Sequence, residues 1–453
     1  MNIDLVVRDA IIVSPYGRTR SDLLIADGRV AGVVAPGTGQ GTDVIEAAGL
    51  YLLPGAVDPH VHMQDPGITH QEDFMTGTGA AAVGGVTTVV EHHRSIPFVL
   101  DVDILRDKIT YLADRARIDY ALFGGVEPDN IDQLHPMWEA GAAAFKIFTC
   151  KVHGVSPILP DKMLEAFREL ASFDAPVLVH AEDDSILKAN EARLRAAGRK
   201  DFEVIREWRT REAEQVAAGT MALLARLTGC RVIIAHASHP AICDLINRER
   251  ALGAKIWTES CPQYFYLTED EIDERGPWCK FTPPARDQAS ADEMWNRLEA
   301  GDIDMICADH APSTMEEKAK GLDDIFEAPF GLPGVETVFP LMLTGVNEGK
   351  ISLERLVATR SQIPAQVYGL WPRKGNLNVG ADADFILVDM EAEKTLRNEE
   401  IVAKTGWTPY QGRKVKGLPV KTFVRGQLVA ANGQPVAEPG WGEFLPGPGM
   451  KDA

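Results

Sequence analysis

The sequence predicts an α/β protein: a (β/α)8 barrel of the TIM type, joined to a small β-sandwich domain that is built from both chain termini. Eight short apolar segments alternate with helical segments in the middle of the 453-residue chain, which is the order expected of a parallel barrel. Segments of β type lie at both ends of the chain. Several of the central segments also end in a residue that can bind a metal ion.

The β-type segments at the termini predict the second domain. Within residues 3–50, the turn Asp27-Gly28 between two apolar segments is a strong hairpin signal. Similar segments run from Asp382 to Val388 and from Lys421 to Val429. Neither terminus holds enough strands for a core of its own, so we expect residues 1–52 and 373–453 to form one sandwich. The Gly- and Pro-rich tail after Pro435 is expected to lie on the surface or against a neighbouring subunit.

Residues 53–372 are predicted to form the barrel, in which the chemistry belongs at the C-terminal ends of the strands. Helical periodicity fills several of the gaps between strands, as in Asp161–Phe173, Glu212–Leu227 and Ala289–Leu298. The predicted strands are Val57–His62, Val86–His92, Ile118–Gly124, Ala142–Phe148, Pro176–Ala181, Arg231–Ala237, Ala254–Glu259 and Ile303–His310.

Histidines and an aspartate follow four of these apolar segments. Alternate residues of a strand project to one side, so His60 and His62 can bind one divalent cation together. Two hydrogen-bonded histidines at a barrel mouth are the alternative. His180, His236 and Asp309 each end another apolar segment, where an unpaired polar group is costly. Four histidines and an aspartate at one end of one barrel indicate a metal site.

Lys146 interrupts the apolar segment from Ala142 to Phe148, which should be a buried strand. A buried ammonium group is costly and needs a carboxylate partner or a lowered pKa. One interpretation is a salt bridge to a neighbouring strand. The other is a lysine converted by carbon dioxide to a carbamate, an anionic ligand that bridges two cations.

Composition excludes several classes of partner. With 46 basic against 66 acidic residues, the net charge of −20 argues against binding to nucleic acid or to anionic membranes. The sequence has no uninterrupted apolar segment of about 18 residues, the length of a membrane span. The six cysteines form no C-x-x-C pair, which favours reduced, buried thiols in a cytoplasmic protein.

The succession His-x-His, Lys, His, His, Asp on successive strands resembles the amidohydrolase superfamily, in particular its cyclic amidohydrolase group of hydantoinases, allantoinases and dihydroorotases. The resemblance covers essentially the whole chain. Besides the metal-site residues, it is carried by the motifs Pro54–His60, Gly84–Thr88, His180–Glu182, Asp309–Pro312, Gly334–Thr337, Gly380–Asp384 and Thr408–Tyr410.

The resemblance implies a role for each residue of the site. His60, His62 and Asp309 would bind the more buried of two divalent cations, and His180 and His236 the more exposed one. Carbamylated Lys146 would bridge them. Zinc suits these ligands, and manganese, iron or cobalt could replace it. A hydroxide shared by the cations would attack the ring carbonyl, while Asp309 acts first as general base and then as general acid.

Residues beyond the strand ends are expected to select the substrate. Dihydroorotases carry Arg at the position of Gln64, which counts against that activity. Gln263 resembles one group of hydantoinases, and Pro283 lies in a loop that can contact a ring through main-chain groups. His93 and Arg94 depart from the family pattern. If they face the cavity, they would favour a polar or anionic substrate, and otherwise they are solvated side chains.

The resemblance therefore implies a cyclic amidohydrolase that cleaves a C–N bond of a small cyclic amide or ureide, of hydantoinase or allantoinase type. Dihydroorotase is the alternative activity. A non-catalytic, dihydropyrimidinase-like interaction protein is the other alternative, and the presence of all six metal-ligand positions argues against it. Relatives imply a homo-oligomer, either a tetramer or a dimer.

Overall fold

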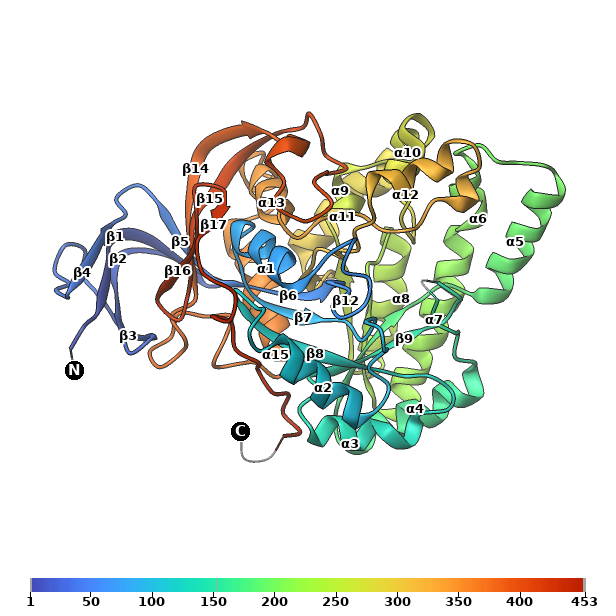
Figure 1. The fold of residues 1–453 in the computed structure, drawn as a ribbon, viewed down its shortest axis with the longest axis horizontal. Helices are drawn as coiled ribbons and strands as arrows, with labels where there is room; N and C mark the ends of the chain where they lie inside the picture. The colour runs from blue at the N-terminus through green and yellow to red at the C-terminus, as the bar shows by residue number, and fades with distance from the viewer. Residues whose placement is uncertain (1, 153, 451–453) are drawn as a thin grey trace.

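The computed structural model describes residues 2–152 and 154–450 and has two parts. In Figure 1 a barrel surrounded by helices lies on the right, and a sheet made from both ends of the chain lies on the left. None of the helices in these residues is long and apolar enough to cross a membrane.

The barrel contains eight parallel strands that are hydrogen-bonded in sequence order, from β6 to β13. All eight predicted strands are present. Every residue of β6 to β10 is buried, because the strands are covered on both faces, and this explains why they read as continuous apolar segments. The strands are β6 (Ala56–Val61), β7 (Val86–Glu91), β8 (Asp119–Gly125), β9 (Ala144–Phe148), β10 (Pro176–His180), β11 (Arg231–Ile234), β12 (Ile256–Ser260) and β13 (Met305–Ile306).

The last barrel strand is shorter than predicted because the chain changes partner. The amide of Cys307 still donates to the carbonyl of Ser260, the last residue of β12. Three residues later, His310 has crossed to the other side and pairs with Val61 of β6. The amide of His62 donates to the carbonyl of His310 at 2.7 Å. This change of partner closes the barrel and places Asp309 between the two pairings.

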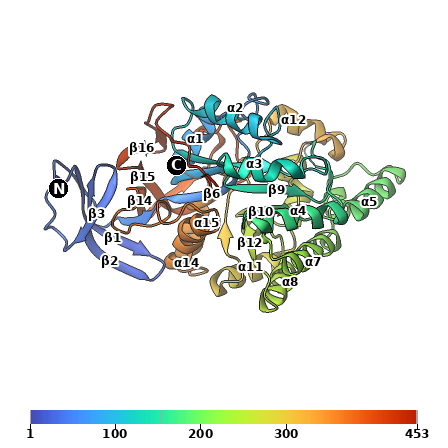
Figure 2. The ribbon, with the colours of Figure 1, turned by 90° about the horizontal axis from the view of Figure 1, so that it is seen from below.

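Helices follow most strands and cover the barrel, as Figure 2 shows for α3, α4, α7 and α8 outside β9, β10 and β12. The three predicted helices correspond to α4, α7 and α11. Thr210 caps the start of α7, and Gly229, at φ 73°, ends it. The helices are α1 (Phe74–Val83), α2 (Val102–Leu112), α3 (Leu134–Glu139), α4 (Pro160–Ser172), α5 (Asp184–Ala196), α6 (Val204–Trp208), α7 (Arg211–Thr228), α8 (Pro240–Ala251), α9 (Gln263–Tyr266), α10 (Glu269–Arg275), α11 (Gln288–Ala300), α12 (Met315–Ala319), α13 (Val338–Asn347), α14 (Leu353–Val357) and α15 (Ile363–Val367).

The two termini form one continuous sheet of nine strands, which confirms that they build a common β domain. The halves join where β5 pairs antiparallel with β14, as in Leu53 opposite Ile386. The predicted turn at Asp27-Gly28 connects β2 to β3. The strands are β1 (Leu5–Ser14), β2 (Gly17–Ala26), β3 (Arg29–Val34), β4 (Asp43–Glu46), β5 (Tyr51–Pro54), β14 (Phe385–Thr395), β15 (Lys414–Val424), β16 (Gln427–Ala431) and β17 (Gln434–Pro435). The boundaries proposed at residues 52 and 372 stay predictions.

The tail after Pro435 is integrated into the barrel rather than merely lying on its surface. The amide of Leu445 donates to the carbonyl of Tyr120 at 2.7 Å, near the start of β8. The Leu445 side chain is 2% exposed and belongs to the apolar cluster inside the barrel, together with Phe123 and Leu178. The tail therefore seals the end of the barrel opposite the strands' C-terminal ends.

Candidate metal centre

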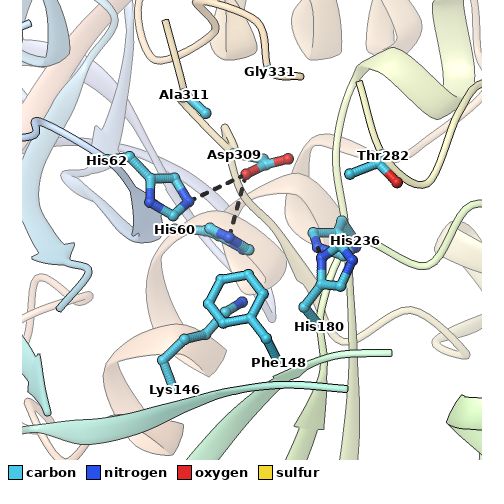
Figure 3. Close-up of a pocket in the computed structure, with 10 residues that line it drawn as sticks. All are labelled: His60, His62, Lys146, Phe148, His180, His236, Thr282, Asp309, Ala311 and Gly331. Atoms are coloured by element: carbon cyan, nitrogen blue, oxygen red, sulfur yellow. Dashed lines mark hydrogen bonds and ion pairs between the residues drawn. The ribbon is translucent and has the colours of Figure 1, made fainter. Parts of the chain in front are cut away.

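Two histidines and an aspartate meet at the C-terminal end of the first barrel strand (Figure 3). Nε2 of His60 lies 3.3 Å from Oδ1 of Asp309, and Nε2 of His62 lies 3.7 Å from the same oxygen. All three side chains are nearly buried. Burial lowers the pKa of His60 to about 3, so this imidazole is neutral and can donate a lone pair. The strand alternation predicted from the sequence produces this convergence.

A second pair of imidazoles faces the first across the pocket. His180 ends β10, and His236 follows β11 by two residues. Nδ1 of His180 lies 2.9 Å from Nε2 of His236. Burial lowers the pKa of both rings, so both are neutral at ordinary pH. Two ring nitrogens that face each other at this distance can bind a common cation.

Lys146 lies on β9 with its side chain 1% exposed. Its Nζ has no hydrogen-bond partner among the described residues, and it lies 5.0 Å from the centre of the Phe148 ring. Burial lowers the pKa of Lys146 to about 8. The structure therefore does not contain the salt bridge that was one of the two interpretations of this lysine. The lowered pKa increases the fraction of the neutral amine, which is the form that reacts with carbon dioxide.

One pocket brings together all six residues predicted to bind metal. Four imidazoles, a carboxylate and an amine without a hydrogen-bond partner are costly to bury together unless a bound cation satisfies their lone pairs. Imidazole and carboxylate are common ligands of zinc and of other divalent first-row metals. The residues fit a metal centre of the His/Asp type. The pocket is lined by His60, His62, Lys146, Phe148, His180, His236, Thr282, Asp309, Ala311 and Gly331.

Two of these residues have left-handed backbone conformations, with φ 39° at His236 and φ 45° at Asp309. Such conformations are uncommon for residues other than glycine and tend to occur at functional sites. His236 lies two residues after the end of β11, and Asp309 lies three residues after the end of β13. The sharp turn directs each side chain toward the pocket.

Two buried glutamates hold the histidines, and the sequence analysis assigned a role to neither. Oε1 of Glu259 lies 2.5 Å from Nδ1 of His60, and Oε2 of Glu182 lies 2.8 Å from Nε2 of His180. In each case the carboxylate occupies one ring nitrogen and leaves the other to face the pocket. Glu259 lies near the end of an apolar strand, which is the same signal that identified the histidines.

The environment of Glu182 keeps it ionised. Burial by itself would raise its pKa, but the Arg209 guanidinium at 3.1 Å and the hydrogen bond with His180 outweigh burial and hold the pKa at about 2. Thr282 Oγ1 also donates to Glu182 at 2.6 Å. In contrast, burial raises the pKa of Glu259 to about 7.

His92 adds a further imidazole to this region. Its ring centre lies 4.2 Å from that of His60 and 4.3 Å from that of His62. Neither of its ring nitrogens has a hydrogen-bond partner among the described residues. One ligand nitrogen each of His60, His62 and His92 lie within 4.8 Å of one another, so these three imidazoles could also hold a metal ion together. His92 is nevertheless not among the residues that line the pocket.

None of the five predicted substrate residues is among the ten that line this pocket. Gln64 is buried and donates from Nε2 to the carbonyl of Pro312 at 3.1 Å. His93 is buried with its ring centre 6.1 Å from that of Phe148, and Arg94 beside it is half-buried. The two other predicted residues, Gln263 at the start of α9 and Pro283 next to Thr282, are also buried. The substrate-binding roles of all five residues stay predictions.

Comparison with known proteins defines the class to which this barrel and its site belong. The model of the Amidohydrolase family matches residues 51–429. The chain is 35% identical to the L-hydantoinase of Paenarthrobacter aurescens and 33% identical to the allantoinase of Deinococcus radiodurans. These alignments cover 98% and 96% of this chain, and 98% and 97% of the relatives.

A solved structure agrees with these relatives. The L-hydantoinase (dihydropyrimidinase) from Arthrobacter aurescens superimposes with a TM-score of 0.95 at 34% identity, over 98% of this chain and all of the other. The chain belongs to the amidohydrolase family. The predicted family and fold class are thereby confirmed.

Proposed function

We propose that this chain hydrolyses the C–N bond of a cyclic amide or ureide, as a hydantoinase or an allantoinase does. The hydantoinase and allantoinase relatives support this reaction over the full length of the chain. The observation that carries the proposal is the convergence of His60, His62 and Asp309 with His180 and His236 in one pocket at the barrel mouth. The proposed product carries a new carboxylate and a terminal carbamoyl NH2 group, as in an N-carbamoyl amino acid or allantoate.

The residues present fit two divalent cations, with zinc as the first choice. His60, His62 and Asp309 would hold one, and His180 and His236 the other. Lys146, as a carbamate, would contribute to both. When bound, such cations lower the pKa of a water molecule and polarise a substrate carbonyl. The unpaired Lys146 amine and the facing imidazole nitrogens support this assignment.

Asp309 is the proposed catalytic residue. Burial raises its pKa, so its carboxylate is a better proton acceptor than an ordinary aspartate. It would accept the proton of the attacking water and donate it to the ring nitrogen as the C–N bond breaks. Protonation is required because an unprotonated amide nitrogen is a poor leaving group.

His93 and Arg94 are proposed to favour polar or anionic rings. His93 packs near Phe148, which lines the pocket. Burial lowers the pKa of Arg94 only to about 10, so its guanidinium stays charged at neutral pH. Gln64, Gln263 and Pro283 are proposed to complete substrate binding. Arg94→Met should lower kcat/KM for anionic rings more than for neutral ones. Equal effects on both kinds of ring would contradict this role.

The test of the reaction is a panel of rings assayed with the zinc-reconstituted protein. Allantoin, hydantoin, 5-substituted hydantoins, dihydrouracil, dihydroorotate and cyclic imides are compared by kcat/KM. Asp309→Asn should lower kcat by about 10²–10⁴-fold, whereas His135→Ala, at an exposed histidine, should not. If no ring of the panel is opened by the metal-loaded protein, the proposal fails.

The carbamate on Lys146 has its own test. Protein prepared with ¹³C-labelled bicarbonate should show one carbamate carbon per chain by NMR, and Lys146→Met should lose this signal together with bound metal. An unmodified lysine in fully metal-loaded, active protein would contradict the assignment. A homo-oligomeric state and a cytoplasmic location stay predictions.

A further inference from the structure

The barrel closes at a seam between its last strand and its first. Neighbouring strands from β6 to β13 are joined by ladders, but no ladder joins β13 back to β6 in the part of the chain that the structure describes. The two sides meet at His310, which exchanges backbone hydrogen bonds with His60 and His62. The seam therefore divides the proposed ligands of one cation, because His60 and His62 lie on one side and Asp309 on the other.

A buried ion pair spans this seam where the ladder is missing. Nη1 of Arg360 lies 2.9 Å from Oδ2 of Asp58, on β6, and 2.8 Å from the carbonyl of Ile306, the last residue of β13. The other carboxylate oxygen, Oδ1, accepts from the amides of His60 and Ala308 at 3.2 Å each. Both charged side chains are fully buried. One carboxylate and one guanidinium thus take the place of the missing ladder.

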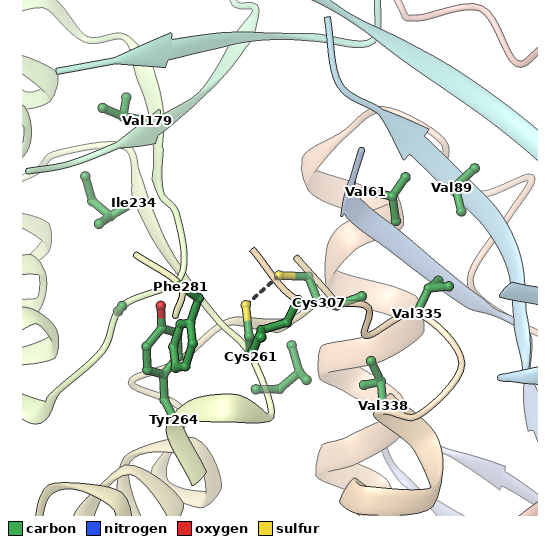
Figure 4. Packing of buried hydrophobic residues seen from close by; sticks show 14 of the residues in the cluster. Val61, Val89, Val179, Ile234, Cys261, Tyr264, Phe281, Cys307, Val335 and Val338 are labelled. Carbon is green, nitrogen blue, oxygen red and sulfur yellow. Dashed lines mark hydrogen bonds between the residues drawn. The ribbon is translucent and has the colours of Figure 1, made fainter. Parts of the chain in front are cut away.

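Arg360 comes from a π-helical turn, Ala358–Gln362, that packs against both β6 and β13. Such turns are rare and often occur at functional sites. The surroundings are apolar, since Val61 of β6, Cys307 after β13 and Val338 of α13 belong to one buried cluster (Figure 4). An ion pair buried among apolar residues contributes little net stability, because desolvation offsets the attraction between its charges. Its bonds to both strands point instead to a role in alignment.

We propose that Arg360 and Asp58 are positioning residues for the cation at the seam. This cation is the one assigned above to His60, His62 and Asp309, so the inference rests on the proposed metal centre. Asp58 bonds to the amide of His60 on one side of the seam and to the amide that precedes Asp309 on the other. Arg360 holds this carboxylate and the end of β13 at once. The pair thereby sets the separation of the ligands, although neither residue is a ligand itself.

The ligands of the other proposed cation provide an internal comparison. His180 ends β10 and His236 follows β11, and these two strands pair in a regular parallel ladder. Backbone hydrogen bonds already align these ligands, so they need no side-chain pair. Loss of the pair between Arg360 and Asp58 should therefore weaken binding at the seam by about 10–100-fold, as for other residues that orient metal ligands, and spare the other cation.

The test measures zinc per chain at buffered free-zinc concentrations, a readout that does not depend on which ring is opened. Arg360→Met and Asp58→Asn should each hold one zinc at a concentration where the wild type holds two. The second zinc should return at a free-zinc concentration about 10–100-fold higher. Arg425→Met is the matched control, because it breaks a mostly buried pair with Asp119 at the start of β8, and it should hold two.

The double variant Asp58→Asn/Arg360→Met separates positioning from stability. Each single change leaves a buried charge without its partner and should lower the free energy of unfolding, whereas the double change removes both charges and should recover part of the loss. Its zinc affinity should stay as low as in the single variants, because the pair that spans the seam is still missing. The double variant also serves if a single variant fails to fold.

Two results would overturn the inference and leave the proposed reaction intact. One is a content of two zinc ions in all three variants under the buffered condition. The other is zinc affinity that recovers together with stability in the double variant, because the pair would then be merely structural. A wild type that binds zinc yet opens no ring would refute the reaction alone, since zinc content still decides on the pair. A wild type that binds no zinc would refute both.

Discussion

Glu259 and His60, which lie 199 residues apart in the sequence, are joined by a contact of 2.5 Å between Oε1 and Nδ1. Both side chains are essentially inaccessible to solvent. Because Nδ1 of His60 is engaged by Glu259, the other ring nitrogen, Nε2, faces the pocket and lies 3.3 Å from Oδ1 of Asp309. The orientation of a first-strand histidine is therefore decided by a residue of the seventh strand.

Replacing Glu259 should weaken metal binding without removing a ligand. Because the carboxylate fixes the ring and raises its basicity, Glu259→Gln should lower the affinity for the more tightly bound ion by about 10–100-fold. Competition with a chelator of known affinity measures this change. Glu293→Gln, at a partly exposed glutamate that pairs with Arg297, serves as the matched control and should leave affinity unaltered. Wild-type affinity in Glu259→Gln would show that His60 needs no partner.

Glu182 is expected to matter for stability as well as for the site. It is the buried partner of Arg209, so Glu182→Gln leaves a guanidinium without a counter-charge. Breaking such a pair costs about 3–5 kcal/mol in the free energy of unfolding. Urea denaturation measures the loss. Glu165→Gln, which breaks the exposed pair with Lys162, should cause no measurable change. Equal stability of the two variants would refute the argument.

Leu445 should contribute to stability but not to catalysis. Leu445→Ala leaves a cavity at the barrel end opposite the site, and it should cost about 2–5 kcal/mol in the free energy of unfolding. The value of kcat should be that of the wild type, because no residue of the pocket moves. Val436→Ala, at a half-exposed side chain of the same tail, should be nearly neutral. A neutral Leu445→Ala would mean that the tail is dispensable for the barrel core.

Glu336 should make stability depend on pH. Burial raises its pKa from 4.5 to about 7, although the amides of Val402 and Ala403 donate to it. Between these values the folded protein keeps a proton that the unfolded chain has released. The contribution to the free energy of unfolding, up to about 3 kcal/mol, is therefore complete below about pH 4.5 and is lost as the pH rises to about 7.

The variant Glu336→Gln isolates this contribution. The difference in unfolding free energy between wild type and variant should decrease from pH 4.5 to pH 7. Glu391→Gln, at an exposed carboxyl, should instead follow the wild type at every pH. A difference that does not change with pH would show that Glu336 titrates normally in the folded protein.

The barrel strands and the six residues of the candidate metal site were predictable because both depend on local pattern. An apolar segment of five to seven residues marks a buried strand, and the polar residue that follows it lies at the strand's C-terminal end. All such ends meet at one side of a closed parallel barrel. His60, His180 and Asp309 could therefore be placed together without any knowledge of their distances.

Other features depended on contacts that no local pattern records. The change of partner that shortens β13 follows from the closing hydrogen bonds of His310 with β6. The tail was predicted to lie on the surface or against a neighbouring subunit, yet Leu445 enters the barrel core. No local pattern predicts that Glu259 contacts His60 or that the sulfurs of Cys261 and Cys307 lie side by side. The strand segments and the residues that end them follow from hydrophobicity and spacing, which can be read along the chain. Which buried polar groups face one another depends on strand register and barrel closure, and these exist only in the folded protein.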